Sequence, residues 1–152
     1  MYERRINVRA IIMRGEKILA VRNKRDDGTA RAYWATPGGG LDPGETLEAG
    51  LKREIMEELG VEAVVKQLLF IQQFPSGRKD ADEELEFFFL VEDSPAYDSV
   101  DLTSTTHGTA ELAQVDFIDP SVVILKPVFL SEIDIVTHVG EDRPVYVSNR
   151  LA

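Results

Sequence analysis

Three glutamates near the middle of the chain, Glu54, Glu57 and Glu58, are spaced so that they can act together. With about 100° of rotation per residue, a helix through them puts all three carboxylates within an arc of about 100°. Glu57 and Glu58 would stand in its last turn, where the helix dipole disfavours negative charge by about 0.3–1 kcal/mol each. Mg²⁺ binds a few carboxylates and bridges substrate phosphates, so it would remove this repulsion. The spacing predicts either a metal site or a solvated acidic face.

The elements around these acids predict a loop followed by a helix. Pro37, Pro43 and four glycines crowd into residues 37–44, which indicates a loop. From Thr46 to Leu59 the apolar residues recur every fourth position, and Gly60 stands where a helix commonly ends. The acidic patch borders this apolar stripe, which is made of Leu47, Leu51, Ile55 and Leu59.

The rest of the chain reads mainly as strands. Residues 6–13 and 17–22 predict a hairpin that turns at 14–16, with a polar segment at 23–33. Residues 92–110 read as a loop, and Pro127 could begin a helix that ends near His138. Further strands are expected at 62–74, 84–91, 112–118 and 144–148.

The segment from Gly39 to Val61 resembles the signature of Nudix hydrolases, G-x5-E-x7-R-E-U-x-E-E-x-G-U, where U is a bulky aliphatic residue. All nine specified positions are filled, within 23 of the 152 residues: Gly39, Glu45, Arg53, Glu54, Ile55, Glu57, Glu58, Gly60 and Val61. A phosphate-binding P-loop is excluded because no Gly-Lys-Ser/Thr follows the glycines. The resemblance implies an α/β (α+β) fold, a single domain over 1–152 in which a mixed sheet lies between helices and carries a loop-helix-loop catalytic element.

The resemblance also implies roles for individual residues. Glu54, Glu57 and Glu58 would bind Mg²⁺, or Mn²⁺ as an alternative, with a carbonyl near Gly38 as a further ligand. Arg53 would pair with Glu45 to brace the loop. Water activated by the metal would then attack a pyrophosphate. Family members take the general base from the box or from a later loop, so Glu54 is one candidate and Glu111 is the other.

Charge and aromatic residues suggest where a substrate binds. Residues 1–79 hold 14 Lys and Arg against 11 Asp and Glu, whereas residues 80–152 hold 3 against 16. An anionic nucleotide would therefore approach the N-terminal half. Its phosphates could meet Arg9, Arg22, Lys24, Arg25 and Arg31, and its base could stack on Trp34, Phe74 or Phe87. The alternative is that the acidic half only maintains solubility and that the aromatics are core residues.

Composition excludes several classes of protein. With no cysteine there is no disulfide, zinc–thiolate site or thiol nucleophile, and only His107 and His138 supply imidazole. The net charge of −10 argues against nucleic-acid binding. No apolar run reaches the roughly 20 residues that span a bilayer, and the N-terminal segment lacks the apolar core of a signal peptide. We expect a soluble, cytoplasmic protein, with a homodimer suggested by the family resemblance.

Taken together, the sequence predicts Mg²⁺-dependent hydrolysis of a nucleoside diphosphate linked to a second group. ADP-ribose is one example, because Pro75 lies 15 residues beyond Gly60, a spacing similar to that of ADP-ribose-type members. A nucleoside triphosphate pyrophosphohydrolase and a non-catalytic nucleotide sensor are the alternatives. A sensor would not need to keep three acids that repel one another.

Overall fold

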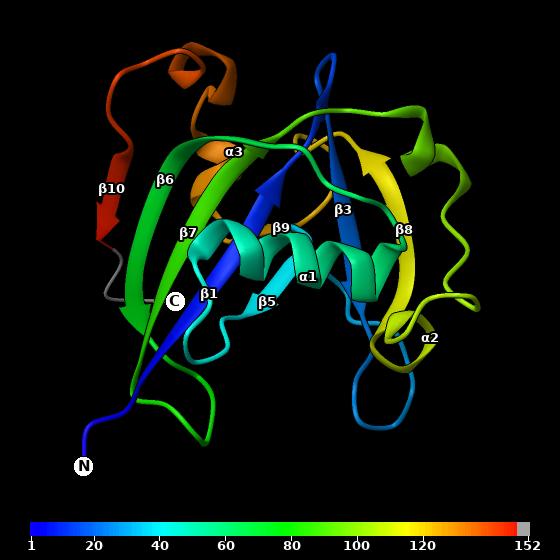
Figure 1. The fold of residues 1–152 in the computed structure, drawn as a ribbon, viewed down its shortest axis with the longest axis horizontal. Helices are drawn as coiled ribbons and strands as arrows, with labels where there is room; N and C mark the ends of the chain where they lie inside the picture. Colours follow the sequence, from blue (N-terminus) through cyan, green and yellow to red (C-terminus); the bar gives the residue numbers. More distant parts are fainter. Residues whose placement is uncertain (149–152) are drawn as a thin grey trace.

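Two β-sheets form the framework of the protein in a computed structural model that describes residues 1–148 (Figure 1). One sheet has the order β10-β6-β7-β1-β5, with β1 (Arg4–Ile11), β5 (Gly38–Gly40), β6 (Val65–Pro75), β7 (Glu83–Val91) and β10 (Val145–Ser148). The other has the order β2-β3-β4-β9, and β8 also pairs with β3; its strands are β2 (Met13–Arg14), β3 (Lys17–Asn23), β4 (Trp34–Ala35), β8 (Leu112–Ile118) and β9 (Leu125–Lys126).

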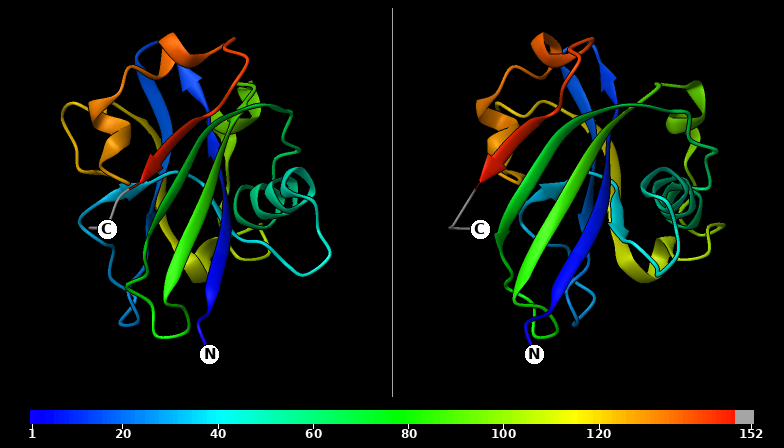
Figure 2. Two further views of the ribbon diagram at one scale, coloured as in Figure 1. Left: turned by 90° about the vertical axis from the view of Figure 1, so that its left-hand side faces the viewer. Right: turned by 60° about the vertical axis from the view of Figure 1, so that its left-hand side comes forward.

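Helices cover both sides of this framework. Figure 2 shows α1 (Leu47–Leu59) on one side of the sheets and α3 (Phe129–Glu132) on the other. Shorter elements complete the chain: η1 (Pro95–Ser99), α2 (Gly108–Glu111) and η2 (Ile135–His138), of which η1 and η2 are 3₁₀ turns. The expected mixed sheet between helices is confirmed.

Strand β1 connects the two faces because its side chains alternate between them. Val8, Ala10 and Ile12, which directly follows β1, join Leu51 and Ile55 of α1 in one buried cluster. The opposite face of β1 contributes to a second buried cluster, which contains Ile11, Phe70, Phe88 and Phe129. Since β1 pairs in parallel with β7 and antiparallel with β5, it also places the glycine-rich strand beside the helix.

Helix α1 starts and ends where the sequence predicts. The Thr46 hydroxyl accepts a hydrogen bond from the Ala49 N–H at 3.1 Å, which caps the first turn. Gly60 takes the left-handed conformation at φ 70°, and its N–H donates to the Met56 carbonyl. These caps fix the length of the helix and therefore the position of its last turn.

The hairpin expected from residues 6–13 and 17–22 is confirmed only next to its turn. Met13 and Arg14 pair with Ile18 and Lys17, whereas β1 turns away and lies between β5 and β7. The reason is burial, because residues from both faces of this apolar run are fully enclosed and need cover on both sides. The expected strands at 62–74, 84–91, 112–118 and 144–148 correspond to β6, β7, β8 and β10.

The single helix expected from Pro127 to His138 is wrong. The chain forms α3, becomes extended at Ile133 (φ −106°, ψ 143°), and then makes the separate turn η2. β-Branched residues such as Ile133, Val136 and Thr137 have restricted side-chain rotamers in a helix. The break also lets Ile135 enter the same buried cluster as Phe129. The segment 92–110, expected as a loop, contains η1 and the start of α2.

Within residues 1–148, no helix combines the length and the apolar character that a membrane crossing requires.

Replacing Thr46 with Ala should lower the free energy of unfolding by about 1 kcal/mol, because an orphan N–H of the first turn loses its acceptor. Chemical denaturation of both proteins measures the difference. Thr106→Ala is the control, since Thr106 is exposed and lies outside any helix or strand. Equal losses in the two variants would contradict the capping role.

Candidate functional site

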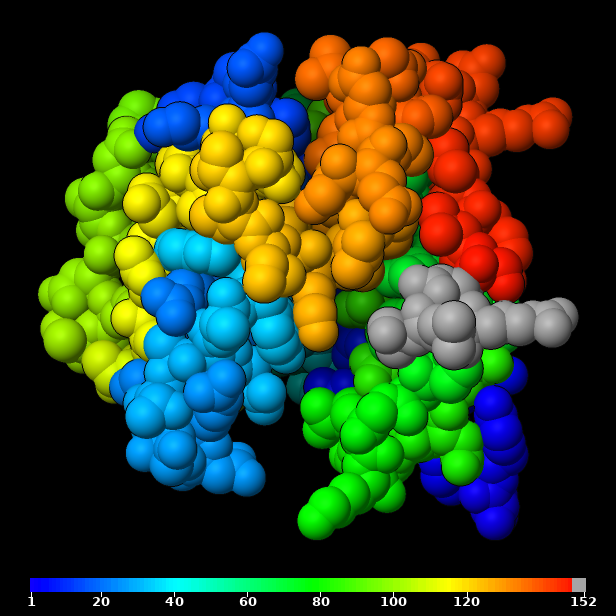
Figure 3. Space-filling model, turned by 180° about the vertical axis from the view of Figure 1, so that it is seen from behind, coloured from blue at the N-terminus to red at the C-terminus, as the bar shows by residue number. Residues whose placement is uncertain are grey.

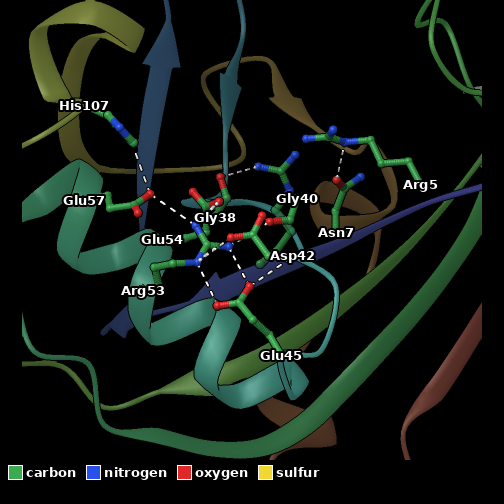
Figure 4. A network of polar contacts seen from close by, with 11 residues as sticks. Arg5, Asn7, Gly38, Gly40, Asp42, Glu45, Arg53, Glu54, Glu57 and His107 are labelled. Carbon is green, nitrogen blue, oxygen red and sulfur yellow. Dashed lines mark hydrogen bonds and ion pairs between the residues drawn. The ribbon is translucent and has the colours of Figure 1, made fainter.

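Arg53 is the centre of a polar network that joins the glycine-rich loop to α1 (Figure 4). Its guanidinium donates to both carboxylate oxygens of Glu45 at 2.8 Å and to the Gly40 carbonyl at 3.0 Å. It also contacts the carboxylates of Glu54 at 3.0 Å and Glu57 at 3.2 Å. The Arg53 guanidinium thus holds the loop against α1 and partly neutralises the charges of Glu54 and Glu57.

Two glycines allow the loop to approach the helix closely. A Cβ atom on Gly39 would lie 2.7 Å from the carboxylate of Glu54, which is closer than real side-chain contacts. A Cβ atom on Gly50 would lie 2.5 Å from Leu41 Cδ1 and 3.3 Å from Glu45 Oε1. The missing side chain of Gly50 therefore leaves room for the loop to pack against the helix. This packing explains why a glycine stands here, although a glycine within a helix lowers its stability by roughly 1 kcal/mol relative to alanine.

Glu58 is the most unusual acid of the site. Its side chain is 4% exposed, and its Oε2 is buried without a hydrogen-bond partner. Burial raises the pKa of Glu58 to about 8; the charge of Arg9 opposes this, and those of Glu54 and Glu111 add to it. Burial likewise raises the pKa of Glu54. A carboxylate enclosed in this way needs a cation or a proton.

The loop before β8 brings two further residues to the site. His107 Nδ1 lies 3.2 Å from Glu57 Oε2, and the His107 N–H donates to the Glu57 carbonyl at 2.9 Å. Glu111 ends α2, and its charge raises the pKa of both Glu54 and Glu58. The sequence pattern gave His107 no role, because its contact with Glu57 spans 50 positions and nothing local indicates it.

The donor set of this site fits a hard divalent cation. Glu54, Glu57 and Glu58 offer carboxylate oxygens, and the partnerless Oε2 of Glu58 is an acceptor that a cation would satisfy. Among the described residues, no three His, Asp or Glu side chains are placed so that they could hold a metal ion by themselves. Mg²⁺ keeps several waters and takes oxygens from substrate phosphates, so it needs fewer ligands from the protein.

A cleft of about 900 Å³ opens on the face of the sheet opposite α1, and Figure 3 shows the hollow between β4, the segment before α3 and the β6–β7 turn. Arg9 lies between this cleft and the acidic site. Its Nε donates to Glu86 at 2.7 Å, and its Nη1 donates to the Gly38 carbonyl at 3.1 Å. The cleft therefore adjoins the glycine-rich strand that lies against Glu54.

The predicted substrate-binding residues divide between the cleft and other places. Phe74 lines the cleft. Trp34 instead packs against the second buried cluster, beneath the guanidinium of Arg22 at 5.8 Å. Arg22 donates to the Arg31 carbonyl, and neither arginine lines the cleft. Tyr33 and Lys126 line it, and no sequence signal indicated either residue.

Comparison with known families matches the NUDIX domain to residues 3–136 of this chain. The chain belongs to the Nudix family. The nine specified positions of the signature predicted this assignment, and the match extends well beyond that signature, from β1 to η2.

Curated Nudix relatives share a part of this sequence. The nucleoside triphosphatase NudI of Enterobacter sp. (strain 638) is 46% identical over 50 residues, which are 33% of this chain and 36% of that protein. NudI of Escherichia coli (strain K12 / DH10B) is 34% identical over 76 residues, or 45% of this chain and 52% of its own length. The chain thus spans 36% and 52% of the lengths of these two relatives.

Solved Nudix-like structures share the fold over most of the chain. The ORF135 protein of E. coli has a TM-score of 0.66 at 20% identity and covers 93% of this chain and 95% of its own. A UDP-X diphosphatase has a TM-score of 0.65 at 22% identity, covering 97% and 67%. An ADP-ribose pyrophosphatase from Streptococcus suis has a TM-score of 0.61 at 17% identity, covering 93% and 98%.

The Glu45–Arg53 pair should stabilise the protein in a pH-dependent way. The hydrogen bonds from Arg53 and from the Asp42 backbone, together with the charge of Arg53, lower the pKa of Glu45 to about 2 from its ordinary 4.5. A lowered folded-state pKa gives stability that is present above pH 4.5 and is lost as the pH falls from 4.5 towards 2. Glu45→Gln should therefore lower the melting temperature at pH 7 and have little effect near pH 2.

Glu16→Gln, at an exposed position in the turn before β3, provides the matched control. It should change the melting temperature little at either pH. A difference between wild type and Glu45→Gln that stays constant from pH 7 to pH 2 would refute the ionic role of the pair.

Proposed function

We propose that this protein is a divalent-cation-dependent hydrolase that cuts the pyrophosphate of a nucleoside diphosphate linked to a second group. The observation that carries the proposal is the buried, partnerless carboxylate oxygen of Glu58 beside Glu54 and Glu57. Burial, with smaller contributions from the neighbouring acids, raises the pKa of Glu54 and Glu58, so their charged forms cost stability unless a cation joins them. The adjoining cleft offers room for a nucleotide.

The residues of the site divide into metal ligands and supports. Glu54, Glu57, Glu58 and the Gly38 carbonyl would hold Mg²⁺, with Mn²⁺ as a substitute. A bound ion lowers the pKa of water and neutralises phosphate oxygens, which favours attack on phosphorus. Arg53 keeps Glu54 and Glu57 on the side of the helix that faces the loop. Glu45 in turn fixes Arg53 through two hydrogen bonds.

Glu111 is our candidate for the general base, because it lies near enough to Glu54 and Glu58 for its charge to raise the pKa of both. Backbone hydrogen bonds hold its segment in place: the Lys24 N–H donates to the Glu111 carbonyl at 2.8 Å, and the Glu111 N–H donates to the His107 carbonyl at 3.1 Å. In this role Glu111 accepts a proton from the attacking water. Glu54 is the alternative base, as its raised pKa also suits proton transfer.

The cleft provides the binding site for the rest of the substrate. Phe74 and Tyr33 line it and would contact a base, and Lys126 Nζ lies over the Tyr33 ring, 4.4 Å from its centroid. Arg9 lies where the diphosphate would pass towards the acids, since it contacts the Gly38 carbonyl from within the cleft lining. We therefore take the substrate to be a small nucleotide, and the net charge of −10 argues against nucleic acid.

A nucleoside triphosphate is the second candidate substrate. The curated relatives are named nucleoside triphosphatases, which favours it. The structures that share the fold include a UDP-X diphosphatase and an ADP-ribose pyrophosphatase, but at 22% and 17% identity they support only the fold. Product analysis separates the two candidates, because a triphosphate gives a nucleoside monophosphate and pyrophosphate.

Replacing Glu57 with Gln should lower kcat for a hydrolysed nucleotide at least 100-fold, since a metal contributes several kcal/mol to charge stabilisation. The fold should remain intact because Glu57 is only partly buried. Glu62→Gln, at an exposed site just after α1, is the control and should keep full activity. Unchanged turnover in Glu57→Gln would refute the assignment of Glu57 as a metal ligand. A nucleotide that binds to the wild-type protein and is not hydrolysed would instead indicate a sensor.

Mg²⁺ should raise the melting temperature of the wild-type protein. An ion at 100 times its dissociation constant stabilises by about 2.7 kcal/mol, which corresponds to a rise of about 5 °C or more. Scanning calorimetry with and without millimolar Mg²⁺ measures the shift, and a triple variant of Glu54, Glu57 and Glu58 to Gln should lose it. An equal shift in the triple variant would mean that Mg²⁺ acts elsewhere.

A further inference from the structure

Buried polar groups are concentrated on the floor of the cleft. The described residues contain six polar or charged side chains that are buried, and four of them line this one cavity: Thr36, Gln72, Glu84 and Glu86. Thr36 and Gln72 are each 1% exposed. Such a concentration is unusual, since buried polar groups lower stability unless they are hydrogen-bonded.

Two of these four side chains have a buried atom without a partner. Thr36 Oγ1 and Gln72 Oε1 receive no hydrogen bond. By contrast, Glu84 accepts from Asn7 Nδ2 and from Ser76 Oγ, each at 2.7 Å, and Glu86 accepts from Arg9. The buried carboxylates of Glu84 and Glu86 therefore have hydrogen-bond partners, whereas the Thr36 hydroxyl and the Gln72 amide oxygen have none.

The next residue on the same strand shows that pairing is available to a glutamine here. Gln73 Nε2 donates to Glu83 at 2.8 Å, and Gln73 Oε1 accepts from the Tyr146 hydroxyl at 2.8 Å. Alternation along β6 turns Gln73 away from the cleft and Gln72 towards it. Only the glutamine that faces the cavity lacks a partner for its oxygen.

The chemistry of the floor points to a ligand that donates hydrogen bonds. Its partnerless atoms are the Gln72 amide oxygen and the Thr36 hydroxyl, and the neighbouring carboxylates of Glu84 and Glu86 only accept hydrogen bonds. A nucleobase with an exocyclic amino group presents N–H donors, as adenine, guanine and cytosine do. A base with a keto group at the same position presents an acceptor, which can pair with the donors of Thr36 and Gln72 but not with the Gln72 oxygen or the carboxylates of Glu84 and Glu86.

We propose that Gln72 and Thr36 determine base specificity by accepting hydrogen bonds from the exocyclic amino group of the substrate's nucleobase. This inference rests on the proposed function, because it takes the cleft as the nucleotide site. Phe74 and Tyr33, which also line the cleft, would hold the ring while Arg9 directs the diphosphate towards Gly38. Keto-bearing bases such as hypoxanthine and uracil leave the Gln72 amide oxygen unpaired and bind less tightly.

The test uses nucleoside monophosphates, which contain no pyrophosphate to cut and therefore report on recognition alone. The pairs AMP with IMP and CMP with UMP each exchange one amino group for a keto group. Isothermal titration calorimetry should show the amino member of each pair binding about tenfold more tightly to the wild-type protein. Gln72→Leu and the nearly isosteric Thr36→Val should each reduce this preference.

Gln73→Leu is the matched control, because it removes a paired glutamine outside the cleft and should leave the preference unchanged. Melting temperatures check folding, and Gln72→Leu should not lower them, since it removes an unpaired buried acceptor. Equal binding within the pairs, a preference for IMP or UMP, no binding at all, or a preference that survives in Gln72→Leu would each overturn the inference. A wild-type enzyme that hydrolyses amino and keto nucleotides with equal kcat/KM would refute base selection while leaving the hydrolase intact.

Discussion

Mutual repulsion among carboxylates along one edge of α1 is the constraint on which the site depends. Arg53 offsets part of it by contacting Glu54 and Glu57 and by fixing Glu45 on the loop. Glu58 lies beyond this network, buried with a partnerless oxygen, and its pKa is raised to about 8. An enclosed carboxylate of this kind needs a proton or a cation from solution, and a bound cation would connect the local structure of the helix to the proposed hydrolysis of a phosphoric anhydride.

The local part of this arrangement could be predicted from the sequence. Capping by Thr46, termination at Gly60 and the four-residue apolar repeat are signals that act within a few residues, and α1 follows them. The spacing of Arg53 and the three glutamates predicted their common face for the same reason. The Nudix signature is a run of such local signals, so it was sufficient to indicate the family and the sandwich.

The long-range part could not be predicted in the same way. The turn at 14–16 was correct, but whether β1 stayed in that hairpin depended on which strands could cover both of its faces. The break at Ile133 depended on the burial of Phe129 and Ile135 in a shared cluster. The cleft was missed for a related reason, because Gln72 reads as an ordinary strand residue until β7 and β4 enclose it. Trp34 looked like a stacking residue and instead packs against the core.

The most direct test of the account is the position of a bound divalent ion. Crystals grown with Mn²⁺ and measured for anomalous scattering would locate it, since Mn²⁺ takes the same oxygen ligands as Mg²⁺. The account predicts an anomalous peak in contact with the carboxylates of Glu54, Glu57 and Glu58, on the side of α1 that faces Gly38. A peak elsewhere, or ordered protein with no peak at millimolar Mn²⁺, would contradict it.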